Sequence, residues 1–250
     1  MATQRVPCGS LTEMLMTHRR HRPLLLLATA AGLAACGTSG STTASPTARA
    51  EETRSAQQIY DDFLTSMASE RSVHIAGHQV DAGGANNDID ILDTQNAASI
   101  SLTAQGVSIY LVVTPAKVYA SQSRNGPWLT APPDLATNAR SLTLANTVRC
   151  GRLEHGGLTR GAVSTVNGQR VVALEDDGRA PGASRSTVYV SVTGPPRLVR
   201  VVQHAAATPG GRADCGQAGA GSSPGISSAS FDFSAWGAAV TVTPPPSAAI

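Results

Sequence analysis

The chain of 250 residues is long enough for one large domain or two small ones, and its hydrophobic content of 41% can form a packed core, which excludes a disordered tail. Aromatic residues make up only 4% and charged residues 14%, while 24 glycines and 15 prolines favour turn-rich β structure over a helical bundle. The formal net charge of +2 does not predict a nucleic-acid partner, because arginines cluster before residue 23 and no basic patch with interleaved aromatic residues follows.

An export signal is predicted near the N-terminus. The cationic stretch 17–22 is followed by the apolar run 23–35, which has the length of a signal peptide. A helix that crosses a membrane needs roughly 20 apolar residues, so this run is too short to span. The long polar preface is untypical of a leader, and we therefore predict that translation starts at Met14 or Met16 and that the signal peptide ends at residue 35.

The apolar run closes on Leu33, Ala34, Ala35 and Cys36, which together resemble the lipobox of bacterial lipoproteins. In that motif the branched residue and the two small residues fit the signal peptidase, and the cysteine is acylated and becomes the new N-terminus. The alternative is a plain secretory signal with an incidental cysteine. The lipobox predicts export and anchoring of Cys36, through its acyl chains, in the lipid of the outer face of the cell membrane. At ~0.8 kcal/mol per buried methylene, several acyl chains make release slow.

The expected mature chain begins with a tether and a helix. Residues 36–50 are rich in Ser, Thr, Gly and Ala, a composition that predicts a flexible tether. Residues 51–250 are expected to form a single α+β domain. Its first helix is predicted from apolar residues that recur at spacings of three and four. These residues are Ala56, Ile59, Tyr60, Phe63, Leu64 and Met67.

A period of two then predicts β-strands. Their short connections, such as Gln105-Gly106, exclude parallel pairing and indicate an antiparallel sheet, and Asn167-Gly168 is typical of a tight hairpin. Pro132-Pro133 opens a second expected helix, from residue 134 to about 148. The expected strands are 73–78, 88–92, 98–104, 107–114, 117–121, 158–166, 170–174, 185–193, 198–204 and 228–233.

Two cysteines, Cys150 and Cys215, follow Cys36. In an exported protein they predict a disulfide bond, with buried free thiols as the alternative. Closing a loop of this size is expected to stabilise the fold by roughly 4 kcal/mol on the chain-entropy model.

The sequence offers no convincing catalytic or metal-binding motif. Segment 221–225 matches the Gly-x-Ser-x-Gly pattern of hydrolases, but Pro224 after the serine has no N–H for an oxyanion hole, and no histidine follows Ser223. His74 and His78 would stand about 13 Å apart along a strand, too far to share a metal ion. We therefore expect a protein that is not an enzyme and has no cofactor.

Features spread along the chain together resemble one known family. The chain resembles the actinobacterial lipoproteins of the LppX and LprG type, which are similar in fold to lipoprotein carriers of the LolA and LolB type. The resemblance implies a strongly curved antiparallel sheet, a half-barrel, with helices covering its concave face and an apolar cavity between them. It also implies a glycolipid or another acyl-chain ligand. The features are the predicted helix, 72–77, Val118-Tyr119, 126–128, 166–169, 194–196, 231–236 and 240–244.

Alternation along the predicted strands selects side chains for the cavity wall. They are Ile75, Ile91, Leu102, Ile109 and Leu111. Two functions stay open at this point. The domain either binds or carries a lipid or another apolar molecule in the cavity, or it has a filled core and binds another envelope protein. A monomer is expected in both cases.

Overall fold

Helix α2 (Ala56–Ser69) begins where Ser55 caps it. The Ser55 hydroxyl accepts a hydrogen bond from the backbone N–H of Gln58, and the Gln58 side chain accepts one from the backbone N–H of Ser55. This reciprocal pair satisfies two N–H groups that the first turn of a helix leaves free. All six predicted apolar positions of the helix are buried, so the predicted amphipathic helix is confirmed.

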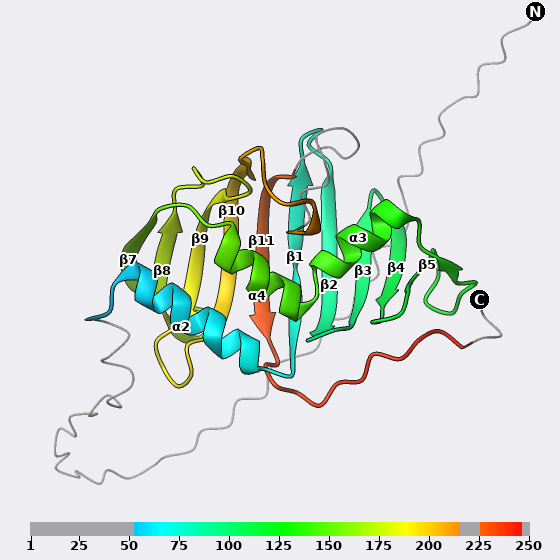
Figure 1. The fold of residues 1–250 in the computed structure, drawn as a ribbon, viewed down its shortest axis with the longest axis horizontal. Coiled ribbons are helices and arrows are strands. Elements are labelled where there is room, and N and C mark those ends of the chain that lie inside the picture. Colours follow the sequence, from blue (N-terminus) through cyan, green and yellow to red (C-terminus); the bar gives the residue numbers. More distant parts are fainter. Residues whose placement is uncertain (1–52, 216–225, 247–250) are drawn as a thin grey trace, which may run out of the picture. The chain divides into compact units, whose positions relative to one another are not determined.

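The computed structural model describes residues 53–215 and 226–246. In this part of the chain, eleven strands form one antiparallel sheet, in the order β6-β5-β4-β3-β2-β1-β11-β10-β9-β8-β7. Figure 1 shows three α-helices on one face of this sheet. The predicted α+β class is confirmed, whereas the strong curvature of the sheet stays a prediction. The strands are β1 (Ser72–Asp81), β2 (Asn86–Thr94), β3 (Ala98–Ala104), β4 (Val107–Val113), β5 (Val118–Ser121), β6 (Leu129–Thr130), β7 (Leu158–Val166), β8 (Gln169–Asp176), β9 (Ser184–Ser191), β10 (Leu198–Ala207) and β11 (Ile226–Ser234).

The pairing of β1 with β11 joins strands β1 to β6 and strands β7 to β11 into one sheet. Ile75 of β1 lies opposite Phe233 of β11 on one side and opposite Ile91 of β2 on the other. The backbones approach so closely at Gly77 that an added Cβ would clash with the carbonyl oxygen of Ser230. Glycine is therefore required at this position in the middle of the sheet.

The second expected helix is in fact two helices, so the prediction of one helix from 134 to about 148 was wrong. Helix α3 (Pro133–Ser141) ends before Thr143, whose backbone is extended, and α4 (Leu144–Leu153) begins after it. The Thr143 hydroxyl and the Asn146 side-chain amide both donate hydrogen bonds to the Arg140 carbonyl, at 2.9 and 2.8 Å. Polar side chains thus replace the helical hydrogen bonds at the break.

The core lies between the sheet and the helices. In Figure 1, α2 and α4 lie in front of the part of the sheet that contains β7 to β11, and α3 lies in front of β2 to β4. The largest fully buried side chains include Ile59 and Met67 of α2, Leu144 of α4 and Leu174 of β8. Among the described residues, no helix is both long enough and apolar enough to cross a membrane.

Candidate functional site

A cavity on the helix side lies at the β6 end of the sheet, and we name it the edge pocket. It has a volume of about 610 Å³ and lies between β4, β5, β6 and the start of α3. Its wall combines aliphatic and proline side chains with a few hydroxyl and amide groups. The lining residues are Ile109, Ala120, Ser121, Gln122, Ser123, Pro127, Leu129, Thr130, Pro132 and Leu135.

The apolar floor of the edge pocket is a continuation of the core face of the sheet. Leu129 lies opposite Ala120, which in turn lies opposite the buried Leu111, so the three side chains share one face. Leu129 is 69% exposed and Ile109 is 38% exposed. The apolar face of the sheet therefore extends beyond the helices that cover it elsewhere.

The edge pocket stays open because α3 is short and starts beside it. Pro132 and Pro133 set the first turn of α3, and Leu135 is the side chain of that helix that reaches the pocket. On the strand side, the positions next to the floor carry the small residues Ala120 and Ser121. Small side chains and a short helix leave space that larger side chains would have filled.

A second, smaller cavity lies under α2 and α4, and we name it the interior pocket. It has a volume of about 270 Å³ and reaches the strands β8 to β11. Aromatic rings from α2 and β11 form its apolar wall, and two of them, those of Tyr60 and Phe63, meet edge to face with centroids 4.8 Å apart. The carboxyl groups of Glu154 and Asp176 also line it, so it has a polar as well as an apolar part.

Burial raises the pKa values of two groups in the interior pocket, Tyr60 and Asp176. The Tyr60 hydroxyl donates a 3.0 Å hydrogen bond to the Gly151 carbonyl. Burial, together with the nearby carboxylates of Asp176 and Asp61, raises the pKa of Tyr60 above its usual range. Burial also raises the pKa of Asp176, although the backbone N–H groups of Gly178 and Gly156 donate to its carboxylate and lower the pKa in part. Neither group is arranged as a base beside a nucleophile.

The residues predicted for the cavity wall fall in two places. Ile75, Ile91 and Leu111 are buried in the core, and Leu102 packs against it half-buried. Only Ile109 lines the edge pocket. The structure thus brings one predicted residue to the cavity and places the others in packed surroundings.

Sequence reasoning missed the other apolar residues of the edge pocket. Leu129 belongs to β6, a strand of two residues that is too short to show a period of two. Leu135 lies in a predicted helix, but its position over β4 and β5 depends on where that helix starts on the sheet. The available signal was an apolar residue, Leu129, that directly follows Gly126-Pro127-Trp128.

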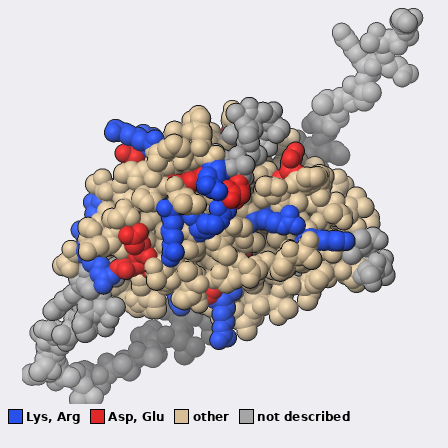
Figure 2. Space-filling model, in the orientation of Figure 1, with Lys and Arg blue, Asp and Glu red and all other residues tan. Residues whose placement is uncertain are grey.

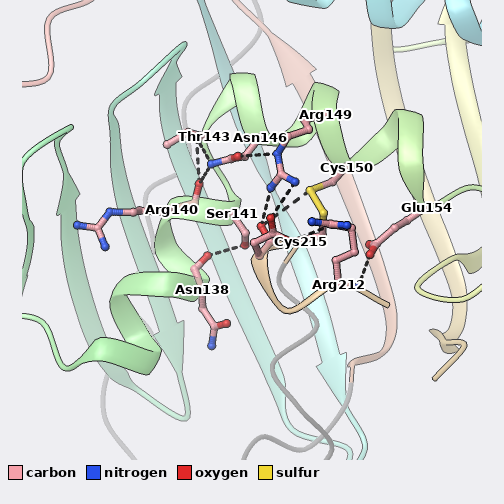
Figure 3. The surroundings of a disulfide bond; sticks show 11 residues. Asn138, Arg140, Ser141, Thr143, Asn146, Arg149, Cys150, Glu154, Arg212 and Cys215 are labelled. Carbon is pink, nitrogen blue, oxygen red and sulfur yellow. Dashed lines mark hydrogen bonds and ion pairs between the residues drawn. A yellow bond between two sulfur atoms is a disulfide. The ribbon is translucent and has the colours of Figure 1, made fainter. Parts of the chain in front are cut away.

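The structure contains the predicted disulfide, Cys150–Cys215, with Cα atoms 5.5 Å apart. It joins α4 to the connection between β10 and β11 (Figure 3). Arg149 donates to the Asp214 carboxylate at 3.0 Å, and the Glu154 carboxylate accepts from the backbone N–H of Arg212. The covalent and polar contacts together fix the C-terminal half of α4 beside the interior pocket.

Several predicted features lie outside the described residues. They include the lipobox, with Leu33, Ala34, Ala35 and Cys36, and the Gly-x-Ser-x-Gly segment 221–225. In the described part of the chain, no three His, Cys, Asp or Glu side chains come close enough to bind a metal ion. His74 instead pairs with Asp90 of the neighbouring strand at 2.9 Å.

No protein-family model and no curated protein matches the sequence. Among solved structures, the chain is similar to the crystal structure of LprF from Mycobacterium bovis. The two chains share 18% identical residues and superpose with a TM-score of 0.49, over 76% of this chain and 96% of that chain.

Proposed function

We propose that this protein is an exported, membrane-anchored envelope lipoprotein without enzymatic activity, which binds or carries a lipid or another apolar molecule in the edge pocket. The observation that carries this proposal is an open cavity of about 610 Å³ with a largely aliphatic wall. Pockets for small molecules usually measure about 300–1,000 Å³ and combine an apolar wall with a few polar groups. The resemblance of the sequence to lipid-carrying lipoproteins points to the same class of ligand.

The polar groups of the edge pocket are gathered in the turn that follows β5. Ser121, Gln122 and Ser123 supply hydroxyl and amide groups there. The Ser121 hydroxyl accepts a 3.1 Å hydrogen bond from the backbone N–H of Ser123, which holds the turn in place. An acyl chain on the floor and a polar head group at this turn fit the two parts of the wall.

Anchoring belongs to the same proposal. Leu33, Ala34 and Ala35 direct cleavage before Cys36, and the acylated Cys36 holds residues 36–50 as a tether and residues 51–250 as the ligand-binding domain at the outer face of the cell membrane. The ligand then comes from the envelope, where glycolipids and other acylated molecules are available.

One observation favours the rival function, an interaction lipoprotein with a filled core. Ile75, Ile91 and Leu111, which were expected to line the cavity, are at most 7% exposed and pack in the core. Under this alternative, the edge pocket would be a surface for another envelope protein and would not take up a lipid.

Filling the edge pocket tests the proposal. We expect Ile109→Trp to lower the affinity for a fluorescent fatty acid at least tenfold in a displacement assay, because the indole occupies the space of the ligand. Val107→Trp is the matched control, since Val107 is two residues away on the same face of β4 but outside the pocket lining. Equal affinities for the two variants, or no uptake of fatty acid by the wild-type chain, would contradict lipid binding in this pocket.

A further inference from the structure

The strands at the end of the sheet around the edge pocket, and the turns between them, lack acidic side chains. Segment 95–133 contains β3 to β6 and their turns, and it has no aspartate or glutamate but includes Lys117 and Arg124. The next residue, Asp134, is an exposed acidic group in the first turn of α3, between the lining residues Pro132 and Leu135. Segment 95–133 itself carries no side-chain charge that repels anionic groups.

The same end exposes aliphatic side chains on one face. Of the five large apolar side chains exposed in the described residues, three belong to β4 and β6: Val107 at 57%, Ile109 at 38% and Leu129 at 69%. The register of the strands places all three on the face that carries the core and the helices. Exposed apolar residues that group beside a pocket are typical of a surface that binds another protein or a membrane.

An arginine and two tyrosines lie at the same end of the sheet, and the strand register places both tyrosines on the face opposite these aliphatic side chains. Arg124 lies over the ring of Tyr110, with its guanidinium carbon 5.3 Å from the ring centroid. Tyr110 and Tyr119 are both half-buried, so each ring has a packed body and an accessible edge. Arginine and tyrosine side chains of this kind suit the boundary between hydrocarbon and water. On the β5 side of the helix face, Figure 2 shows mostly uncharged surface crossed by Lys or Arg side chains.

We propose that this end of the sheet docks onto the surface of a lipid bilayer that contains anionic phospholipids. The sheet meets the bilayer with its β6 edge, so that Val107, Ile109 and Leu129 from one face enter the boundary between head groups and acyl chains, and Arg124, which stacks on Tyr110 of the other face, lies among the phosphate groups. The absence of acidic residues from 95–133 favours an anionic lipid surface over an average protein surface. This inference rests on the proposed function in one respect, because it places the mouth of the edge pocket where an apolar ligand can pass to the membrane without crossing water.

Sedimentation with lipid vesicles tests the docking. The chain used starts at residue 36 and carries Cys36→Ser, which removes acylation and retains every described residue. We expect it to bind vesicles of phosphatidylglycerol and phosphatidylcholine. Val107→Ser and Leu129→Ser should each lower the partition coefficient about tenfold, because each removes an aliphatic side chain that enters the boundary. Arg124→Gln should weaken binding to these vesicles about fivefold and leave weak binding to pure phosphatidylcholine unchanged.

Leu153→Ser is the matched control. Leu153 is 54% exposed at the end of α4 and lines neither pocket. The docking proposal is overturned if Leu153→Ser lowers vesicle binding as much as Val107→Ser does, or if the parent chain does not bind vesicles. It is also overturned if light scattering shows a self-association that Val107→Ser abolishes, because the surface would then join two copies of the chain.

Fatty-acid displacement without vesicles separates this inference from the proposed function. Val107 does not line the edge pocket, so Val107→Ser should lose vesicle binding and keep its affinity for the fatty acid. If the parent chain does not bind vesicles but shows normal displacement of the fatty acid, only the docking is contradicted. Normal vesicle binding without displacement contradicts only the proposed lipid binding.

Discussion

At the scale of single residues, Asp93 is the group that the fold accommodates least easily. Its side chain lies on the core face of β2 and is 0% exposed, and within the described residues neither carboxylate oxygen has a hydrogen-bond partner. Burial raises the pKa of Asp93 to about 8, while the nearby backbone N–H groups of Leu144 and Thr94 lower it in part. A carboxyl group in this position is stable in its protonated form.

The buried Asp93 makes stability depend on pH. Its pKa is about 8 in the folded chain and 3.8 when it is unperturbed, so the folded state binds a proton that the unfolded state has lost between these values. The free energy of unfolding therefore falls as the pH rises from about 4 to about 8, because only the unfolded chain loses the proton of Asp93 in this range. The slope is up to about 1.4 kcal/mol per pH unit.

We expect Asp93→Asn to flatten this slope and to be more stable than the wild-type chain at pH 8. Urea unfolding across this pH range measures both quantities. Asp88→Asn is the matched control, since Asp88 is an exposed aspartate of the same strand. A wild-type slope that persists in Asp93→Asn would show that another group causes it.

At the scale of elements, helix α4 depends on contacts with distant parts of the chain. The disulfide and the Arg149–Asp214 ion pair attach it to the connection between β10 and β11. On its other side, the Gly151 carbonyl accepts the hydrogen bond from Tyr60 of α2. Helices of ten residues are marginal in isolation, so these contacts supply much of what keeps α4 on the sheet.

Removing the disulfide should therefore lower stability measurably. The bond closes a loop with a sequence separation of 65, for which the chain-entropy model gives about 4 kcal/mol. We expect the double variant Cys150→Ser, Cys215→Ser to lose about this free energy of unfolding in urea. Arg149→Gln should lose less than 1 kcal/mol, because its ion pair with Asp214 is half-exposed. A double variant as stable as the wild-type chain would contradict a stabilising role of the bond.

The sequence could predict most elements of the fold because their signals are local. The spacing of Ile59, Phe63 and Met67 on α2 and the alternation in β1 to β4 need no knowledge of distant contacts. The break at Thr143 was missed because it depends on side-chain hydrogen bonds to the Arg140 carbonyl, and the periodicity of the helix continues across it.

The candidate site was less predictable than the fold. Alternation correctly places Ile75 and Ile109 on the same face of the sheet, but it cannot show that helices cover one and leave the other exposed. That difference depends on the order of strands in the sheet, in which β1 is central and β4 is close to the β6 edge. The order follows from the pairing of β1 with β11, whose residues are far apart in the sequence.

At the scale of the whole domain, the described residues divide the sheet into a covered part and an open end. Under α2 and α4 the apolar face is packed, with a small interior pocket of about 270 Å³. At the β6 end the same face borders the edge pocket of about 610 Å³. The proposed binding of an apolar molecule needs a stable core and an accessible apolar site, and this division provides both in one sheet.

Native mass spectrometry of the protein purified from its own host, followed by lipid extraction, tests the central claim most directly. Lipid binding in the edge pocket predicts a defined co-purifying lipid, present in the wild-type chain and in Val107→Trp but lost in Ile109→Trp. A folded protein with the mass of the processed, acylated chain alone, which takes up no lipid when challenged with envelope extract, would contradict the claim and favour the interaction lipoprotein.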